Sequence, residues 1–383
     1  MKIVCAPDSF KGSIDAVSAA AAMASGIYSA MSDVSIDECP IGDGGEGTLR
    51  ALTKALDGRR LAVSVSGLHG QAVEAEIACF DSGNFCFVES AEAIGIQTLA
   101  EPERDIMTAS SFGVGELMLQ AGEQDTARIL VGLGGSATND GGCGMAQALG
   151  IKFFDEADRL IDTPLAGGSL HRIHRIDASS RSSAAEETDV IALCDVTNPL
   201  TGPNGAAAVF GPQKGASAEA VEQLDQGLAH LADVVRRDLD IDISGIPGAG
   251  AAGGLGAGMV AFADARLVSG IETILDAVDF RSRVDGASLC LTGEGRIDGQ
   301  SLSGKACMGV ARVAADAGVP VVALVGSAGP DASRCLDAGL TDFVVIGQGL
   351  DVAESMRRAA ALLAECAAAA VKKYRPNDAT ING

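Results

Sequence analysis

The chain has 383 residues and a formal net charge of −23 at pH 7. This length suggests two or three domains with a substantial buried core, and the acidic balance argues against nucleic-acid binding, which needs a basic surface. Although 47% of the residues are apolar, polar residues or glycines interrupt every run before it reaches the ~18 apolar residues of a membrane span. Residues 1–8 lack the pattern of a signal peptide, so a cytoplasmic location is expected.

The numbers and positions of the cysteines and glycines indicate the redox compartment and the kind of loops in the chain. The ten cysteines form no CxxC pair and mostly stand within apolar runs, which is typical of small buried side chains in a reducing compartment. Glycine, with 49 residues, is used about twice as often as its ~7% average. The glycines cluster with Asp, Glu, Ser and Thr, so they predict loops that form sites rather than low-complexity sequence.

The chain begins with alternating strand and helix patterns. Residues 2–7 predict a buried strand, and 14–31 predict an alanine-rich helix for which Ser13 is the expected N-cap. A second strand over 34–41 and a helix over 48–56 complete a βαβα pattern. Such a pattern implies parallel strands.

The pattern changes after residue 60. Short runs rich in Val, Ile and Phe, separated by turn residues, predict an antiparallel or mixed sheet over 60–66, 72–80 and 84–88. A helix is predicted over 102–122. The polar, turn-rich stretch 155–189 predicts a hairpin with a surface excursion.

The stretch from Ala127 to Gly144 is typical of a strand, a glycine loop and a helix. Six glycines there interleave with Ser, Thr and Asn. The N–H groups at such a helix start favour an anion, most often phosphate, because the positive end of the helix dipole lies there. The expected nucleotide-phosphate residues are Gly134, Gly135, Ser136, Thr138 and Asn139.

Further along, an amphipathic helix is predicted over 218–239, and a second glycine loop over 245–258. After residue 288 the alternating pattern returns. Strands are predicted over 288–292, 319–325 and 341–346, and helices over 305–317, 332–338 and 352–374. The two ends of the chain therefore resemble each other more than the middle.

This organisation predicts a discontinuous α/β domain with a second domain inserted into it. The expected boundaries are 1–60 with 285–375 for the first domain and 61–284 for the inserted, mixed α/β domain. Residues 376–383 are expected to form a flexible tail.

Acidic, glycine-rich turns come after several of the predicted strands. In open α/β sheets, ligands bind at the carboxyl ends of the strands. Carboxylates beside phosphate loops suggest Mg²⁺, and Lys11 and Arg296 could neutralise a phosphoryl group in transfer while one carboxylate accepts a hydroxyl proton. The acidic residues of these turns are Asp8, Asp43, Glu46, Asp195, Glu294 and Asp298.

Three other features give weaker evidence of function. Residues 299–305 have the spacing of a P-loop, but Ala306 lacks the hydroxyl that binds Mg²⁺ and the run does not directly follow its strand, so a Walker A loop is rejected. His171 and His174 have no third ligand nearby, so no zinc site is expected. Lys214 is either functional or a solvated loop charge.

One alternative is serious. Gly132 to Ala137 fits the dinucleotide pattern G-x-G-x-x-A, and Asp155 stands about where a ribose-binding acid would lie. This predicts an NAD-dependent dehydrogenase acting on a small hydroxy acid. Against it, the loop is longer than the pattern, the helix is short and no second mononucleotide half follows. A non-catalytic nucleotide or organic-acid sensor is a third possibility.

Six motifs, in order along nearly the whole chain, resemble the bacterial type I glycerate kinase family: 6–13 (APDSFKGS), 42–48 (GDGGEGT), 132–142 (GLGGSATNDGG), 194–206 (CDVTNPLTGPNGA), 209–216 (VFGPQKGA) and 292–301 (TGEGRIDGQS). The resemblance implies ATP- and Mg²⁺-dependent phosphorylation of D-glycerate, with the 2-hydroxyl as the expected position. It also implies a Rossmann-like parallel-sheet domain with an inserted mixed α/β domain. The oligomeric state stays open, with a homo-oligomer possible.

The resemblance does not divide the acidic residues between metal binding and base catalysis, so their roles are assigned by chemistry. Asp195 is expected to accept the hydroxyl proton, with Lys11 and Arg296 as the catalytic cations. Asp8 and Ser9 are expected to bind the substrate together with these two cations. Asp43 and Asp298 are the expected Mg²⁺ ligands.

Overall fold

The structure, a computed structural model, describes residues 1–82, 84–98, 104–182, 188–303 and 305–374. Its contacts divide the chain into two compact units. Unit 1 contains 1–43, 50–57 and the chain from 271 onward, and unit 2 contains 44–49 and 58–270. The tail predicted over 376–383 lies outside the described residues.

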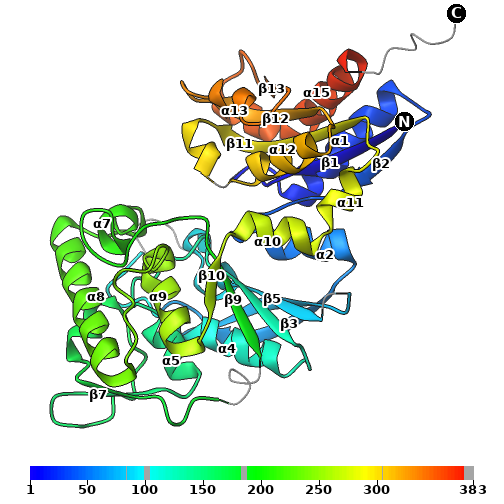
Figure 1. The fold of residues 1–383 in the computed structure, drawn as a ribbon. Helices are drawn as coiled ribbons and strands as arrows, with labels where there is room; N and C mark the ends of the chain where they lie inside the picture. Colours follow the sequence, from blue (N-terminus) through cyan, green and yellow to red (C-terminus); the bar gives the residue numbers. More distant parts are fainter. Residues whose placement is uncertain (83, 99–103, 183–187, 304, 375–383) are drawn as a thin grey trace, which may run out of the picture. The chain divides into compact units, whose positions relative to one another are not determined.

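Unit 1 is built on a parallel sheet of five strands (Figure 1). The strand order is β13-β12-β11-β1-β2. The first two strands in the chain are adjacent, and the last three extend the sheet on the other side of β1, as the alternating pattern at both chain ends predicts. The bounds are Lys2–Pro7 (β1), Ser35–Glu38 (β2), Leu289–Ile297 (β11), Val321–Ala328 (β12) and Asp342–Val345 (β13).

Helices cover both faces of this sheet. Alternate strand residues such as Ile3, Leu291 and Leu324 share a core with α1 (Ala16–Ala30) and α15 (Ala359–Lys373). The intervening residues, also buried, face α12 (Ala306–Asp316). This alternation follows from the two-residue period of a strand. The remaining helices of unit 1 include α11 (Phe280–Val284), α13 (Arg334–Asp337) and α14 (Val352–Arg357).

Three local predictions in unit 1 were wrong. The N-cap of α1 is Asp15, whose Oδ1 accepts the Ser18 N–H at 2.8 Å, and not Ser13. Strand β11 does not end at residue 292 but continues to Ile297, because it keeps pairing with β12 through the glycines expected to form a turn. The single helix predicted over 352–374 is two helices, α14 and α15.

Unit 2 contains a mixed sheet of six strands in the order β10-β9-β6-β5-β4-β3, which confirms the predicted mixed architecture. Strands β3, β4 and β5 pair antiparallel, and β5, β6, β9 and β10 pair parallel. The strand bounds are Arg59–Ser66 (β3), Ala72–Phe80 (β4), Phe85–Glu89 (β5), Arg128–Gly132 (β6), Asp189–Leu193 (β9) and Arg266–Val268 (β10). The hairpin predicted within 155–189 was wrong: in the described part of that stretch the named strand is β8 (Arg175–Asp177), and it pairs antiparallel with β7 (Lys152–Phe154), which lies before the stretch.

One extended apolar core packs this sheet against its helices. The long amphipathic helix is α8 (Ala218–Leu239), with the bounds that its pattern predicts. The other helices of unit 2 include α3 (Ser90–Ile94), α4 (Phe112–Gly122), α5 (Cys143–Ala148), α7 (Ala206–Phe210) and α9 (Ala251–Ala263). Two more helices, α2 (Thr48–Leu56) and α10 (Gly270–Ala277), contain a point in the sequence where one unit ends and the other begins. Within the described residues, no helix is both long enough and apolar enough to span a membrane.

Three further predictions in unit 2 need correction. The helix predicted over 102–122 begins only at Phe112, as α4, and the described residues before it, 104–111, are not helical. The glycine loop predicted over 245–258 is partly helical, because α9 begins at Ala251 and only 252–254 leave the helical conformation. Gly253 there has φ +70°, and a Cβ on it would lie 2.0 Å from the Thr138 carbonyl oxygen. The cysteines are not all free thiols: Cys79 and Cys86 stand opposite each other in the β4–β5 hairpin and form a disulfide.

Candidate functional site

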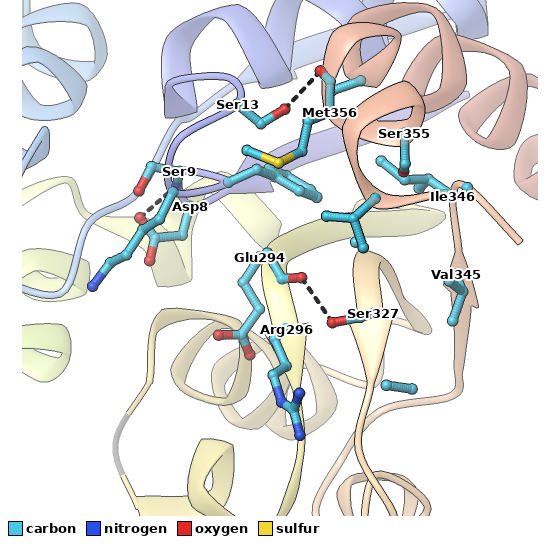
Figure 2. Close-up of a pocket in the computed structure, with 18 of the residues that line it drawn as sticks. Asp8, Ser9, Ser13, Glu294, Arg296, Ser327, Val345, Ile346, Ser355 and Met356 are labelled. Atoms are coloured by element: carbon cyan, nitrogen blue, oxygen red, sulfur yellow. Dashed lines mark hydrogen bonds between the residues drawn. The ribbon is translucent and has the colours of Figure 1, made fainter. Parts of the chain in front are cut away.

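A cavity of about 760 Å³ lies in unit 1 at the carboxyl ends of its central strands (Figure 2). This is the edge where parallel α/β sheets bind ligands. The loop after β1 brings Asp8, Ser9 and Lys11 to it, and β11 brings Arg296. All four residues predicted to bind the substrate therefore line one cavity, together with the predicted metal ligand Asp43.

The carboxylates of this cavity repel one another. The pKa of Asp8 lies well above its usual value, first because of burial and then because Asp43 and Glu294 disfavour its ionised form. Burial also raises the pKa of Glu294, and Lys305 partly opposes this shift. A bound cation would relieve this repulsion.

Glu294 was one of the acidic turn residues but received no predicted role, and Lys305 was not a predicted site residue. Glu294 is 6% exposed, and its Oε1 is buried without a hydrogen-bond partner among the described residues. Its Oε2 lies 3.3 Å from the Lys305 Nζ, which also donates to the Arg296 carbonyl oxygen at 3.2 Å. The sequence signal for Lys305 was the P-loop spacing: the Walker A interpretation was rejected, but the lysine still lines the cavity.

The two predicted metal ligands have different surroundings. Asp43 lines the cavity, whereas Asp298 is not among its lining residues and accepts a hydrogen bond from the Arg296 Nε at 2.9 Å. Among the described residues, no three His, Cys, Asp or Glu side chains lie close enough to hold an ion by themselves. Mg²⁺ is usually bound by one or two carboxylates with water and substrate phosphates. The unpartnered Glu294 oxygen and the mutually repelling carboxylates fit that mode.

The glycine loop of unit 2 follows β6, as predicted, but the fold uses several of its N–H groups. The Gly134 N–H donates to the Gly44 carbonyl oxygen at 3.3 Å, and the Ala137 N–H to that of Ile94 at 2.8 Å. At the start of α5, the Asp140 carboxylate accepts the N–H groups of Gly142 and Gly144. The Asp140 carboxylate therefore takes up the N–H groups of Gly142 and Gly144 at this helix start, and the phosphate contacts expected of residues 134–139 stay a prediction.

The side chains of this loop are buried. Ser136, Thr138 and Asn139 are at most 6% exposed, while Gly135 is exposed with φ +80°. The Thr138 hydroxyl and both amide atoms of Asn139 have no hydrogen-bond partner within the part of the chain that the structure describes.

Lys214 is not a solvated loop charge. It is 3% exposed, and its Nζ donates to the Ser136 Oγ at 3.2 Å and to the Thr138 carbonyl oxygen at 2.8 Å. Burial lowers the pKa of Lys214 to about 7, although nearby Asp140 opposes the shift. The lysine of the 209–216 motif therefore fixes the loop of the 132–142 motif.

Asp195 follows β9, as predicted, and the fold holds it in place. Its Oδ1 accepts the Ser269 hydroxyl and the Gly270 N–H, both at 2.9 Å. These two residues lie where β10 gives way to α10. The carboxylate thus has a defined orientation, which base catalysis requires.

Glu89, at the end of β5, organises the loop of the 42–48 motif. Its carboxylate is 2% exposed and accepts the N–H groups of Gly47 at 2.8 Å and Leu49 at 2.9 Å. Burial raises the pKa of Glu89 to about 7, although these two hydrogen bonds oppose the shift. Sequence reasoning missed this residue because it ended the strand at residue 88.

Comparisons with known proteins agree with these motifs. Residues 3–375 match the model of the glycerate kinase family. The chain is 40% identical to a glycerate kinase of Halalkalibacterium halodurans over 366 residues, which cover 95% of this chain and 96% of that protein. It is 43% identical to a glycerate 2-kinase of Escherichia coli K12 over 327 residues, 85% of each chain. A crystal structure from Salmonella typhimurium LT2, described as a candidate glycerate kinase 2, superposes with a TM-score of 0.83 at 38% identity and covers 97% of this chain and 98% of its own.

Proposed function

The chain belongs to the glycerate kinase family, and from this premise we propose that it transfers the γ-phosphoryl group of ATP to the 2-hydroxyl of D-glycerate, giving 2-phosphoglycerate. The observation that carries this proposal is the cavity of unit 1, which gathers Lys11, Arg296 and Lys305 beside three carboxylates at the carboxyl ends of parallel strands. Phosphoryl transfer requires this combination of positioning groups and charges rather than covalent participation by the protein.

In this proposal the polar end of the cavity binds D-glycerate. Lys11 and Arg296 attract its carboxylate and neutralise charge on the phosphoryl group, and Asp8 and Ser9 orient its hydroxyls. Asp195 accepts the proton of the attacking hydroxyl. The loop residues Gly134, Gly135, Ser136, Thr138 and Asn139 remain our prediction for contacts with nucleotide phosphate.

Mg²⁺ is the proposed metal. Asp43 and Asp298 would hold it, and the orphaned oxygen of Glu294 is a third candidate ligand. When bound, Mg²⁺ would supply positive charge that offsets the negative charge of the phosphoryl group in transfer. Arg296 already pairs with Asp298, so a cation at Asp298 would compete with Arg296 for that carboxylate. The cytoplasm is the compartment that we propose for this reaction.

A coupled assay of ADP release with ATP, Mg²⁺ and D-glycerate tests the proposal. We expect turnover that requires all three, and phosphorus NMR of the product should distinguish 2-phosphoglycerate from 3-phosphoglycerate. A change in nicotinamide absorbance with a hydroxy acid would instead support the dehydrogenase. Binding of both ligands without turnover would support the sensor.

A Lys11 variant tests the site within this assay. Lys11→Met should lower kcat/KM for D-glycerate by at least ~100-fold, because a charge-assisted contact to the reacting groups is lost. Lys54→Met, at an exposed lysine of α2 outside the cavity, is the matched control and should leave kcat/KM unchanged. Equal activity of the two variants would remove Lys11 from the proposed site.

A further inference from the structure

The cavity of unit 1 is too large and too apolar for glycerate alone. Its volume of about 760 Å³ falls within the ~300–1,000 Å³ range of pockets for drug-sized ligands. D-glycerate has three carbons, each bearing oxygen, so it offers no apolar surface to bury. The rest of the cavity has room for a second ligand with an apolar part.

Five apolar residues line the cavity, and we refer to them together as the apolar wall: Phe10, Ile346, Leu350, Val352 and Met356. Three of these side chains are unusually exposed for their type: Leu350 and Met356 are each 39% exposed, and Val352 is 75% exposed. They fall within seven consecutive residues and open toward one cavity. Exposed apolar groups gathered in this way mark a binding surface.

The apolar wall is fixed by the fold. The Leu350 N–H donates to the Gly347 carbonyl oxygen at 2.9 Å and closes the turn before α14, whose N-cap is Asp351. The Ser13 hydroxyl donates to the Met356 carbonyl oxygen at 2.9 Å, which ties α14 to the loop after β1 (Figure 2). These contacts hold the backbone that carries Leu350, Val352 and Met356 in place, which lowers the ordering cost of binding a ligand there.

The cavity also has two chemically distinct ends. Lys11, Arg296 and Lys305 supply positive charge where β1 and β11 end. Four of the five residues of the apolar wall come from the segment 345–356 after β13, and Phe10 comes from the loop after β1. Gln348, in the same segment 345–356, also lines the cavity and carries an amide donor and acceptor of the kind that pairs with a purine edge. A ligand with a flat aromatic part at one end and anionic groups at the other matches this division.

We propose that the cavity of unit 1 binds the adenosine half of ATP, with the adenine against the apolar wall of Phe10, Ile346, Leu350, Val352 and Met356 and the phosphates toward the cationic end. The inference rests on the proposed use of ATP and adds where its base and ribose bind. No step of it depends on the glycine loop of unit 2.

Calorimetric titration of the full chain with ATP, adenosine and inorganic tripolyphosphate tests the inference. The variant Leu350→Ser/Val352→Ser removes apolar surface from the wall, and we expect it to weaken ATP and adenosine binding by at least about tenfold. Tripolyphosphate lacks a base, so its affinity should change less than about twofold. KM for D-glycerate should stay unchanged.

Leu336→Ser is the matched control, because Leu336 is also 39% exposed in unit 1 but does not line the cavity. It should bind all three probes like the wild type. Val352→Ser alone guards against misfolding of the double variant, since its side chain is three-quarters exposed. That single change should still weaken adenosine binding about threefold.

The outcomes separate the two proposals. If the wild-type enzyme is active and the variants of the apolar wall bind ATP as tightly as it does, the inference is overturned and the proposed function is not. Equal weakening of tripolyphosphate and ATP would also overturn it, because the lost contacts would not involve the base. Wild-type protein that neither binds ATP nor releases ADP would overturn the proposed function and the inference together.

Discussion

At the scale of single residues, Asp195 offers the sharpest test of the proposed chemistry. Asp195→Asn keeps an oxygen that can accept from Ser269 and Gly270, but the amide cannot take up a proton. We expect kcat to fall at least ~100-fold with little change in the Mg²⁺ concentration needed for half-maximal activity. Asp189→Asn, at an exposed aspartate that pairs with Arg266, should keep full activity. Recovery of the Asp195 variant by added Mg²⁺ would make this residue a metal ligand.

Glu89 predicts a dependence of stability on pH. Its pKa of about 7 in the folded protein lies above the ordinary value of 4.5, so the folded state holds this proton more tightly than the unfolded state. The resulting stabilisation is full below about pH 4.5 and is lost as the pH rises through 7; a shift of this size corresponds to about 3 kcal/mol. Glu89→Gln should therefore flatten the fall of unfolding free energy between pH 5 and 8.

Denaturant titrations across this pH range measure that change. Glu74→Gln, at an exposed glutamate of β4, is the control and should leave the pH profile of the wild type intact. A Glu89→Gln profile parallel to that of the wild type would mean that other buried carboxyls, such as Asp8 and Asp140, cause the dependence.

Sequence reasoning at this scale identified candidate residues from the turns at the carboxyl ends of the strands. The rule placed Asp8, Ser9, Lys11, Asp43 and Arg296 on one cavity, because parallel strands end at a common edge. It missed Glu89 through a one-residue error in a strand end. It also missed the burial of Lys214, which depends on contacts with a loop 76 to 78 residues away that no local pattern encodes.

At the scale of elements, the glycine loop after β6 carries a test of its own. Gly135 is exposed with φ +80°, whereas a Cβ on Gly134 would meet the Gly45 Cα at 2.5 Å and disturb packing. We therefore choose Gly135→Ala, which should weaken ATP binding at least about tenfold if the loop backbone approaches phosphate.

Gly70→Ala is the matched control for backbone strain. Gly70 also has φ +80°, and nothing lies within 4 Å of its added Cβ. Both variants should lose about 1–2 kcal/mol of stability, because an L-residue is strained in this conformation. Unchanged ATP affinity in Gly135→Ala, with the same loss of stability as Gly70→Ala, would move the phosphate contacts away from this loop.

Elements with a strong period were predictable from sequence, and those set by packing were not. The amphipathic helix α8 has its predicted bounds, and β3 and β4 lie within a residue of theirs. Two glycine-rich stretches that were predicted as turns or loops are instead regular structure, one a strand and the other a helix. Residues 293–297 continue as strand because β12 supplies hydrogen-bond partners, and 255–258 are helical because small residues allow close packing against the loop at Gly141.

At the scale of the whole molecule, the domain boundaries near 60 and 285 remain a prediction. The contacts divide the chain instead after Asp43, after Leu49, after Asp57 and after Gly270. Limited trypsin digestion should cut first within 155–189, where the Arg159 side chain is 78% exposed, or at these junctions. Mass spectrometry of the fragments identifies the cuts. Early cleavage within 1–50 or 320–350 would argue against an inserted domain.

The fold class was predictable at this scale because alternating strands and helices at both chain ends imply one parallel sheet. What the sequence could not provide was the point of division. The short segment 44–49 belongs by its contacts to unit 2, although its neighbours on both sides belong to unit 1. The N–H groups of Gly47 and Leu49 donate to the Glu89 carboxylate, which ties this segment to unit 2. No change in composition marks it.

The strand order of unit 1 has a consequence for biosynthesis. Strand β1 lies between β2 and β11, yet β11 begins at Leu289, near the end of the chain. At a translation rate of roughly 5–20 residues per second, β1 waits on the order of tens of seconds for this neighbour. All of unit 2 leaves the ribosome in the meantime. Nascent β1 and β2 would therefore present an unpaired strand edge, which is the kind of surface that chaperones shield from aggregation.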